Sequence, residues 1–133
     1  MVRRNSFRLP GHPVSVGLAR RRVRDHLAAW GHGPRDRTLE HAVLLVSELA
    51  TNAVRHGSSA RAGFEVAVTA LADGSCLVEV SDGSRSEPRP GRAAEDEETG
   101  RGLHLVEHLA TAWGVWGGDR HGKTVWALIP AGP

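Results

Sequence analysis

The chain has few of the residues that build covalent or stacked frameworks. It contains one cysteine, Cys76, and no tyrosine, and aromatic residues make up only 5% of its 133 residues. A single cysteine excludes an intrachain disulfide framework and a multi-cysteine zinc site, so we expect Cys76 to pack as a small apolar residue. The shortage of aromatic residues leaves little with which to stack single-stranded nucleic acid, and we expect no direct nucleic-acid ligand.

Long apolar runs are also missing. No stretch approaches the roughly 20 apolar residues that a membrane-spanning helix needs, and no run of signal-peptide length follows the basic start. We therefore expect no membrane contact and a cytoplasmic location. The length predicts a single domain over residues 1–133, with a partly flexible N-terminus over residues 1–12.

The net charge is only +2, but the charges are unevenly distributed. Residues 1–24 hold seven arginines and no acid, whereas Glu95 to Glu98 are four consecutive acids. A basic segment can contact phosphate backbones. A solvated helix face with a loose terminus is the simpler interpretation of the same residues, and we favour it.

Hydrophobic periodicity and turn residues predict the secondary structure. Asp36 is placed to cap the second of two long helices, and Gly57 to end it. The order of the elements predicts an α+β two-layer sandwich, with helices on one face of a largely antiparallel mixed sheet. The expected elements are an extended stretch at 6–10, helices at 13–30 and 36–56, strands at 64–69 and 76–80, a loop at 82–99, a helix at 102–112, and strands at 115–117 and 125–129.

Two short motifs match known patterns without their usual surroundings. Gly117 to Thr124 fits the P-loop pattern, but a β-rich run follows it where a P-loop needs a helix, so we interpret it as a hairpin turn. His104 to His108 fits the zinc-protease pattern H-x-x-E-H, but no third ligand is identifiable, and we interpret the histidines as surface residues.

A third set of residues forms an ordered constellation. Glu48 and Asn52 lie one turn apart on the second helix, where a carboxylate can accept a proton and an amide oxygen can bind a hard cation. Asp82 ends a strand just before a glycine, and its carboxylate can accept a hydrogen bond from an exocyclic amine. Gly100 and Gly102 precede a predicted helix, whose N-terminus favours phosphate.

In this constellation the chain resembles the GHKL ATP-binding proteins, and within them the anti-sigma-factor serine/threonine kinases of the compact actinobacterial type. The resemblance extends over about Pro13 to Pro130 and is strongest in 45–57 and 100–114. It implies the GHKL fold, ATP and Mg²⁺ as cofactors, and a lid over ATP at residues 85–99. In the roles that the resemblance implies, Glu48 is the general base, Asn52 the magnesium ligand and Asp82 the residue that binds the adenine amino group. Gly100, Gly102 and Leu103 wrap the phosphates, and Thr124 adds a hydroxyl near the base or phosphates. Arg55 and His56 contact the phosphates or the lid, and Ser84 and Arg101 are further nucleotide-binding residues.

The resemblance further implies a function in partner switching. The chain would transfer the ATP γ-phosphoryl group to a serine or threonine of an anti-sigma-factor antagonist, and would alternately hold a sigma factor; related kinases often form homodimers. One departure keeps an alternative open. The usual adenine motif is D-x-G-x-G, but Ser84 and Ser86 replace its two glycines. The alternative is therefore a non-catalytic regulatory module that binds ATP weakly or not at all.

Overall fold

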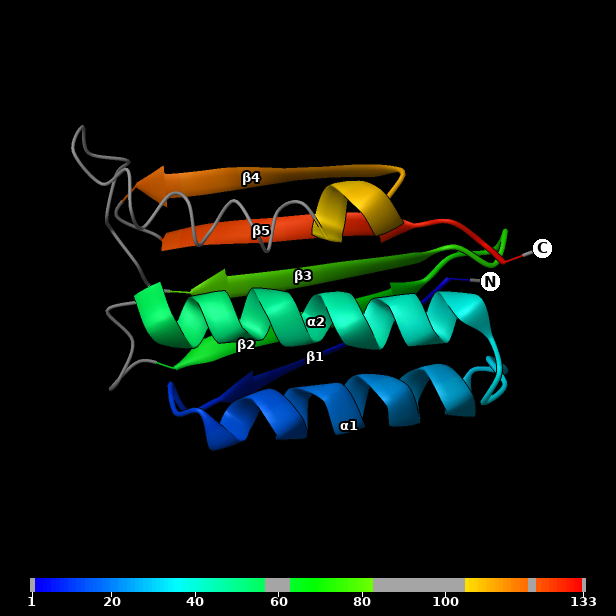
Figure 1. Cartoon of the computed structure of the whole chain (residues 1–133), viewed down its shortest axis with the longest axis horizontal. Helices are drawn as coiled ribbons and strands as arrows, with labels where there is room; N and C mark the ends of the chain where they lie inside the picture. The colour runs from blue at the N-terminus through cyan, green and yellow to red at the C-terminus, as the bar shows by residue number, and fades with distance from the viewer. Residues whose placement is uncertain (1, 57–62, 83–104, 120–121, 133) are drawn as a thin grey trace.

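The protein forms a five-stranded sheet covered on one face by two long helices (Figure 1). The computed structural model describes residues 2–56, 63–82, 105–119 and 122–132. The elements in chain order are β1 (Arg3–Leu9), α1 (Val14–Ala29), α2 (Arg37–His56), β2 (Phe64–Ala70), β3 (Cys76–Asp82), β4 (Ala112–Asp119) and β5 (Gly122–Ile129).

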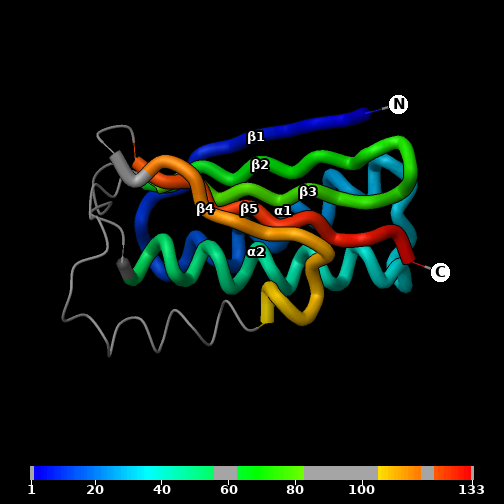
Figure 2. Tube along the Cα trace, turned by 90° about the horizontal axis from the view of Figure 1, so that it is seen from above, coloured from blue at the N-terminus to red at the C-terminus, as the bar shows by residue number. Residues whose placement is uncertain are grey.

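The strand order in the sheet is β1-β2-β3-β5-β4, and each neighbouring pair among these strands is antiparallel. Figure 2 shows both helices on the same side of the sheet. The predicted two-layer α+β architecture is therefore confirmed. Within the described strands, however, the sheet is entirely antiparallel, where a mixed one was expected.

Helix α1 packs against the sheet and α2 through a stripe with a spacing of four. Ala19, Val23 and Leu27 on this stripe are fully buried. Its expected end is confirmed, because the helix stops at Ala29 and Gly31 follows with a φ of 104°. L-residues rarely adopt a positive φ, so glycine suits this position.

Helix α2 is the central element of the core. The stripe that faces the sheet is apolar: Val43, Val46, Ala50 and Ala53 are all buried. Leu45 is also fully buried, so the apolar surface of α2 is wider than one stripe. Burying this wide surface is the main stabilisation of a helix inside a protein.

Strand β3 shows the alternation of a sheet with one covered face. Cys76, Val78, Val80 and Asp82 are buried toward the helices, and the residues between them are half-buried. Cys76 is fully buried as expected, and burial raises the pKa of its thiol to about 12. The turn between β2 and β3 contains Gly74, which has a φ of 89°.

Several predicted boundaries were wrong, including the start of the last strand, which was expected at residue 125 and is Gly122 in β5. Residues 3–9 pair with β2 along their whole length as β1, where a partly flexible terminus was expected. The helix expected at 102–112 is helical at 105–109 only within the described residues. It ends early because the Thr111 N–H donates to the Leu128 carbonyl, which turns the chain into β4 at Ala112. Strand β4 therefore starts three residues before its predicted position.

The two ends of the sandwich carry different parts of the chain. The C-terminal ends of α2 and β3 lie at one end of the sandwich, and the two chain termini lie at the other (Figure 1). At the end with the termini, the Thr38 hydroxyl donates a hydrogen bond of 2.9 Å to the Pro130 carbonyl. In the described part of the chain, no helix is long and apolar enough to cross a membrane.

Candidate functional site

The C-terminal half of α2 carries the two central residues of the predicted site. Glu48 and Asn52 are half-buried and lie one turn apart, on a helix whose other positions nearby are largely buried apolar residues. Half-burial leaves both polar groups reachable by a ligand while the apolar neighbours fix the backbone beneath them. The helix therefore presents a carboxylate and an amide in a fixed relation.

Asp82 lies at the same end of the molecule, as the last residue of β3. It is one of the few buried polar residues, with 8% of its surface exposed. The even alternation of β3 turns its side chain toward the helical layer, and α2 packs directly on this strand. The structure thus brings Asp82 and the end of α2 to one end of the sandwich, on one face of the sheet (Figure 1).

Thr124 does not join this group. Directly opposed residues of an antiparallel pair share a face of the sheet. Thr124 is opposite Ser81, and the two hydroxyl oxygens are 2.7 Å apart, on the face that the helices leave open. Lys123 is the residue opposite Asp82 and shares its face. The structure therefore places Thr124 and Asp82 on opposite faces of the sheet, whereas the resemblance implies a site role for both.

Lys123 was not among the residues predicted from the sequence, although it lies on the same face of the sheet as Asp82. A two-residue alternation continues backward from Ile129 through Ala127 and Val125 to Lys123 and was the available signal. It was obscured because Trp126 and Leu128, on the other face, are apolar as well. A half-buried cation at this position adds positive charge to the Asp82 side of the sheet.

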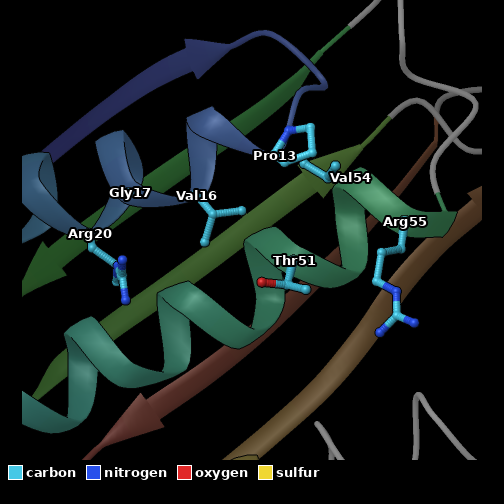
Figure 3. Close-up of a pocket in the computed structure, with 7 residues that line it drawn as sticks. All are labelled: Pro13, Val16, Gly17, Arg20, Thr51, Val54 and Arg55. Atoms are coloured by element: carbon cyan, nitrogen blue, oxygen red, sulfur yellow. The ribbon is translucent and has the colours of Figure 1, made fainter.

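Arg55 lies at the edge of a different feature. It is exposed, and together with six other residues it lines a groove of about 440 Å³ between the start of α1 and the end of α2 (Figure 3). Arg55 and Arg20 stand at opposite ends of the groove, with Thr51, Val54 and Val16 between them. The Thr51 hydroxyl donates to the Ser47 carbonyl at 2.7 Å and is already satisfied.

This groove is distinct from the predicted nucleotide site. At 3.6 residues per turn, Asn52 and Val54 point about 160° apart on α2. Val54 faces the groove and α1, so Asn52 points away from the groove. A ligand in the groove would therefore not contact Asn52.

The remaining predicted residues are divided between described and undescribed parts of the chain. His56 is the last residue of α2, and its side chain is not described. The other predicted contacts lie outside the described residues, as does the predicted lid at 85–99. They are Ser84, Gly100, Arg101, Gly102 and Leu103.

The P-loop-like and zinc-protease-like motifs lie on strands and on a short helical segment. Thr124 continues into β5, which pairs with β4, so the hairpin interpretation of residues 117–124 is confirmed. In the second motif, Glu107 and His108 are exposed on the segment 105–109. The described residues contain no group of three or more His, Cys, Asp or Glu side chains arranged to hold a metal ion.

The donor set at the end of α2 suits a magnesium nucleotide. Mg²⁺ prefers oxygen ligands and is often held by few protein groups together with substrate phosphates. The Asn52 amide oxygen is such a ligand, and Asp82 is a buried acceptor suited to an exocyclic amine. These residues fit the group, although no metal-binding cluster made of side chains alone is present among the described residues.

Known proteins resemble the chain in sequence and in fold. The family described as "Histidine kinase-like ATPase domain" matches residues 9–129. No curated protein matches significantly. Thirteen chains of solved structures match. One is the histidine kinase domain from Erythrobacter litoralis EL346 blue-light activated histidine kinase, with a TM-score of 0.55 and 24% identity, over 92% of this chain and 62% of that one.

The two comparisons differ in what they establish. At 24% identity the solved structure supports the fold alone, and this chain spans less than two thirds of its length. The family match covers nearly all of the sequence, from the end of β1 to the end of β5, and includes α2 and Asp82. The chain therefore belongs to the family of histidine kinase-like ATPase domains, and its fold is of the GHKL type.

Proposed function

We propose that the protein is an ATP-dependent serine/threonine protein kinase of the anti-sigma-factor type. Its substrate would be a hydroxyl of an anti-sigma-factor antagonist, and its second partner a sigma factor that it holds inactive. The observation that carries this proposal is the fixed pair of Glu48 and Asn52, half-buried on α2, with buried Asp82 at the same end of the sandwich. Family membership supports the nucleotide, and the resemblance to anti-sigma-factor kinases supports the substrate.

The proposed roles follow from the chemistry of each side chain. When bound, ATP would supply the phosphoryl group, and Mg²⁺ would neutralise the charge that develops on it. Phosphoryl transfer needs positioning more than covalent catalysis. Glu48 accepts the proton of the attacking hydroxyl. Asn52 holds the cation through its amide oxygen, and Asp82 accepts a hydrogen bond from the adenine amine. Lys123 favours the anionic nucleotide from the opposing strand.

Substitution of Glu48 separates binding from chemistry. Glu48→Gln keeps the size of the side chain and removes its proton acceptor, so phosphoryl transfer to the antagonist should slow by about 10²–10⁴-fold. Binding of Mg-ATP, measured by calorimetry, should change by less than about threefold, because the contacts to the nucleotide remain. Transfer of labelled phosphate at the wild-type rate in this variant would overturn the kinase mechanism.

Two companion variants complete this experiment. Glu40→Gln, an exposed acid in the first turn of the same helix, is the matched control and should leave the transfer rate unchanged. Asn52→Ala should lose the magnesium dependence of ATP binding while keeping the far-ultraviolet circular dichroism of the wild type. A rate loss in the Glu40 variant as large as that in the Glu48 variant would show that the effect is not local.

A second candidate is the non-catalytic regulatory module. Ser84 and Ser86, which replace two glycines of the usual adenine motif, favour it, because glycine lets the chain pass close to a ligand. The same calorimetry distinguishes the two functions. A folded wild-type protein that binds no Mg-ATP at millimolar concentration, yet binds its partner, would be this module.

A further inference from the structure

The groove between α1 and α2 is a concave feature that the proposed kinase mechanism does not use. It has a volume of about 440 Å³ and lies between the start of α1 and the end of α2 (Figure 3). Pockets that hold small molecules in proteins commonly measure about 300–1,000 Å³. The groove is therefore large enough to hold a small molecule.

The middle of the groove is apolar. Val16 and Val54 are half-buried and pack against the core, and both also line the groove. The hydroxyl proton of Thr51 is committed to the Ser47 carbonyl. An apolar body can therefore gain free energy by covering the two valines, whereas an uncharged polar group finds little to bond with between them.

Both ends of the groove are positively charged. Arg20 and Arg55 are exposed and stand at its opposite ends, and none of its described lining residues is acidic. Arg20 forms no salt bridge within the described part of the chain. A guanidinium presents its N–H donors in a planar fork that matches a carboxylate. The charge of the groove therefore favours an anion, and Arg20 can bind the anionic group.

Gly17 leaves space in the wall of the groove that α1 forms. Glycine is unfavourable inside a helix, and alanine is the better helix former. Among the described residues, a Cβ atom at Gly17 would meet only a terminal nitrogen of Arg20, at 3.9 Å, which is an ordinary contact distance. The packing of the described chain therefore does not require glycine at this position. What glycine provides is room beside the arginine at one end of the groove.

We propose that the groove binds a small amphipathic carboxylate, with its carboxylate on Arg20 and its apolar body along Val16 and Val54. Arg55 adds positive potential at the other end. Both halves of the site determine this ligand class. An uncharged apolar molecule would leave the guanidinium without a partner, and a bare anion would leave the two valines uncovered. The proposal goes beyond the kinase function and requires no nucleotide.

Nitrogen–proton correlation NMR of the ¹⁵N-labelled full chain, titrated with octanoate, tests the proposal. Ligands of this size gain limited binding free energy, so we expect a dissociation constant on the order of 1 mM. The shifted amides should concentrate in residues 13–20 and 51–55, which carry the groove. Octanamide has the same body without the charge and should bind at least fivefold more weakly. Equal affinity for both compounds would overturn the proposal, as would the absence of saturable shifts in these residues.

Two substitutions in α1 test the head and the body of the site separately. Arg20→Gln should raise the dissociation constant of octanoate at least fivefold. Arg21→Gln, at an exposed position that does not line the groove, is the matched control and should change it by less than twofold. Gly17→Leu should fill the groove and abolish the shifts, with a melting temperature at or above that of the wild type, because leucine is the better helix former. Equal weakening by both arginine variants, or wild-type binding in Gly17→Leu, would contradict the proposed site.

An acidic peptide is the alternative occupant. A blocked tetrapeptide with two glutamates flanking two leucines should bind no more tightly than octanoate, because a flexible peptide loses conformational freedom on binding. If it shifts the same amides and binds at least tenfold more tightly, the groove is a docking site for a protein segment and the small-molecule assignment is wrong. All these titrations are made without nucleotide, so the proposal can fail while the proposed function holds, and the reverse.

Discussion

Asp36 serves as the N-terminal cap of α2. Its Oδ1 accepts a hydrogen bond of 3.1 Å from the Leu39 N–H, and its Oδ2 lies 3.0 Å from Nδ1 of His32. Burial opposes ionisation of this carboxyl, but the Leu39 hydrogen bond and the contact with His32 outweigh it, so the pKa of Asp36 lies below its ordinary value. The predicted cap is therefore confirmed, and it makes the start of α2 sensitive to acid.

We expect Asp36→Ala to lower the free energy of unfolding by about 1 kcal/mol at neutral pH, which is typical of a lost cap. Because the folded-state pKa is lowered, the contribution of the charge is present above the unfolded value of about 3.9 and is lost as the pH falls through the folded value. Asp36→Asn keeps an acceptor and removes this titration. Its stability, measured by urea unfolding from pH 6 to pH 3, should decline less than that of the wild type, and an equal decline would contradict this role.

At the level of the secondary-structure elements, side chains of β5 alternate between the two faces of the sheet. This alternation places Lys123, and not Thr124, on the face that carries Asp82. Lys123→Ala should weaken Mg-ATP binding by about two- to fivefold, because a partly buried positive charge is removed from the Asp82 side of the sheet. Thr124→Val should leave this affinity unchanged and cost up to about 1 kcal/mol of stability through the lost Ser81 contact. Calorimetry and thermal unfolding measure the two effects. An affinity loss in the Thr124 variant alone would restore the original assignment.

The helices were predictable because their signals are local. The spacing of Val23 and Leu27, the cap at Asp36 and the glycines after each helix all lie within a few residues of the structure they specify. The composition of α2 also indicated Glu48 and Asn52 as candidates, since polar residues one turn apart are conspicuous on an apolar helix. The order of helices and hairpins then sufficed for the two-layer architecture.

The edge strands were less predictable because their partners are distant in sequence. Residues 3–5 of β1 have almost no hydrophobic signal, and they become a strand only through pairing with β2. Ala112 continued the helical pattern before it, and its strand conformation depends on β5. The face of the sheet on which Thr124 lies was unpredictable for a related reason. Both faces of β5 are apolar, so the alternation of its side chains is visible only in the folded sheet.

At the scale of the whole molecule, Cys76 reports on global unfolding. It lies at the start of a central strand and is fully buried, and burial raises the pKa of its thiol to about 12. The thiolate is the reactive form, so an aromatic disulfide reagent at pH 8 should modify native protein more than about 100-fold slower than unfolded protein. The rate should rise along the same urea curve as circular dichroism. Fast labelling of the native chain would contradict the buried position.

The placement of the two termini at one end of the sandwich determines how the domain responds to tension (Figure 1). A force applied between the ends acts across the strands, because β1 lies at the sheet edge and β5 lies beyond β2 and β3. Such a load peels β1 from β2 one backbone hydrogen bond at a time, each worth about 1 kcal/mol, and does not shear a whole strand at once. The domain should therefore begin to unfold at low force from the end that carries both termini. At the far end, α2 and β3 still hold Asn52 and Asp82 in place.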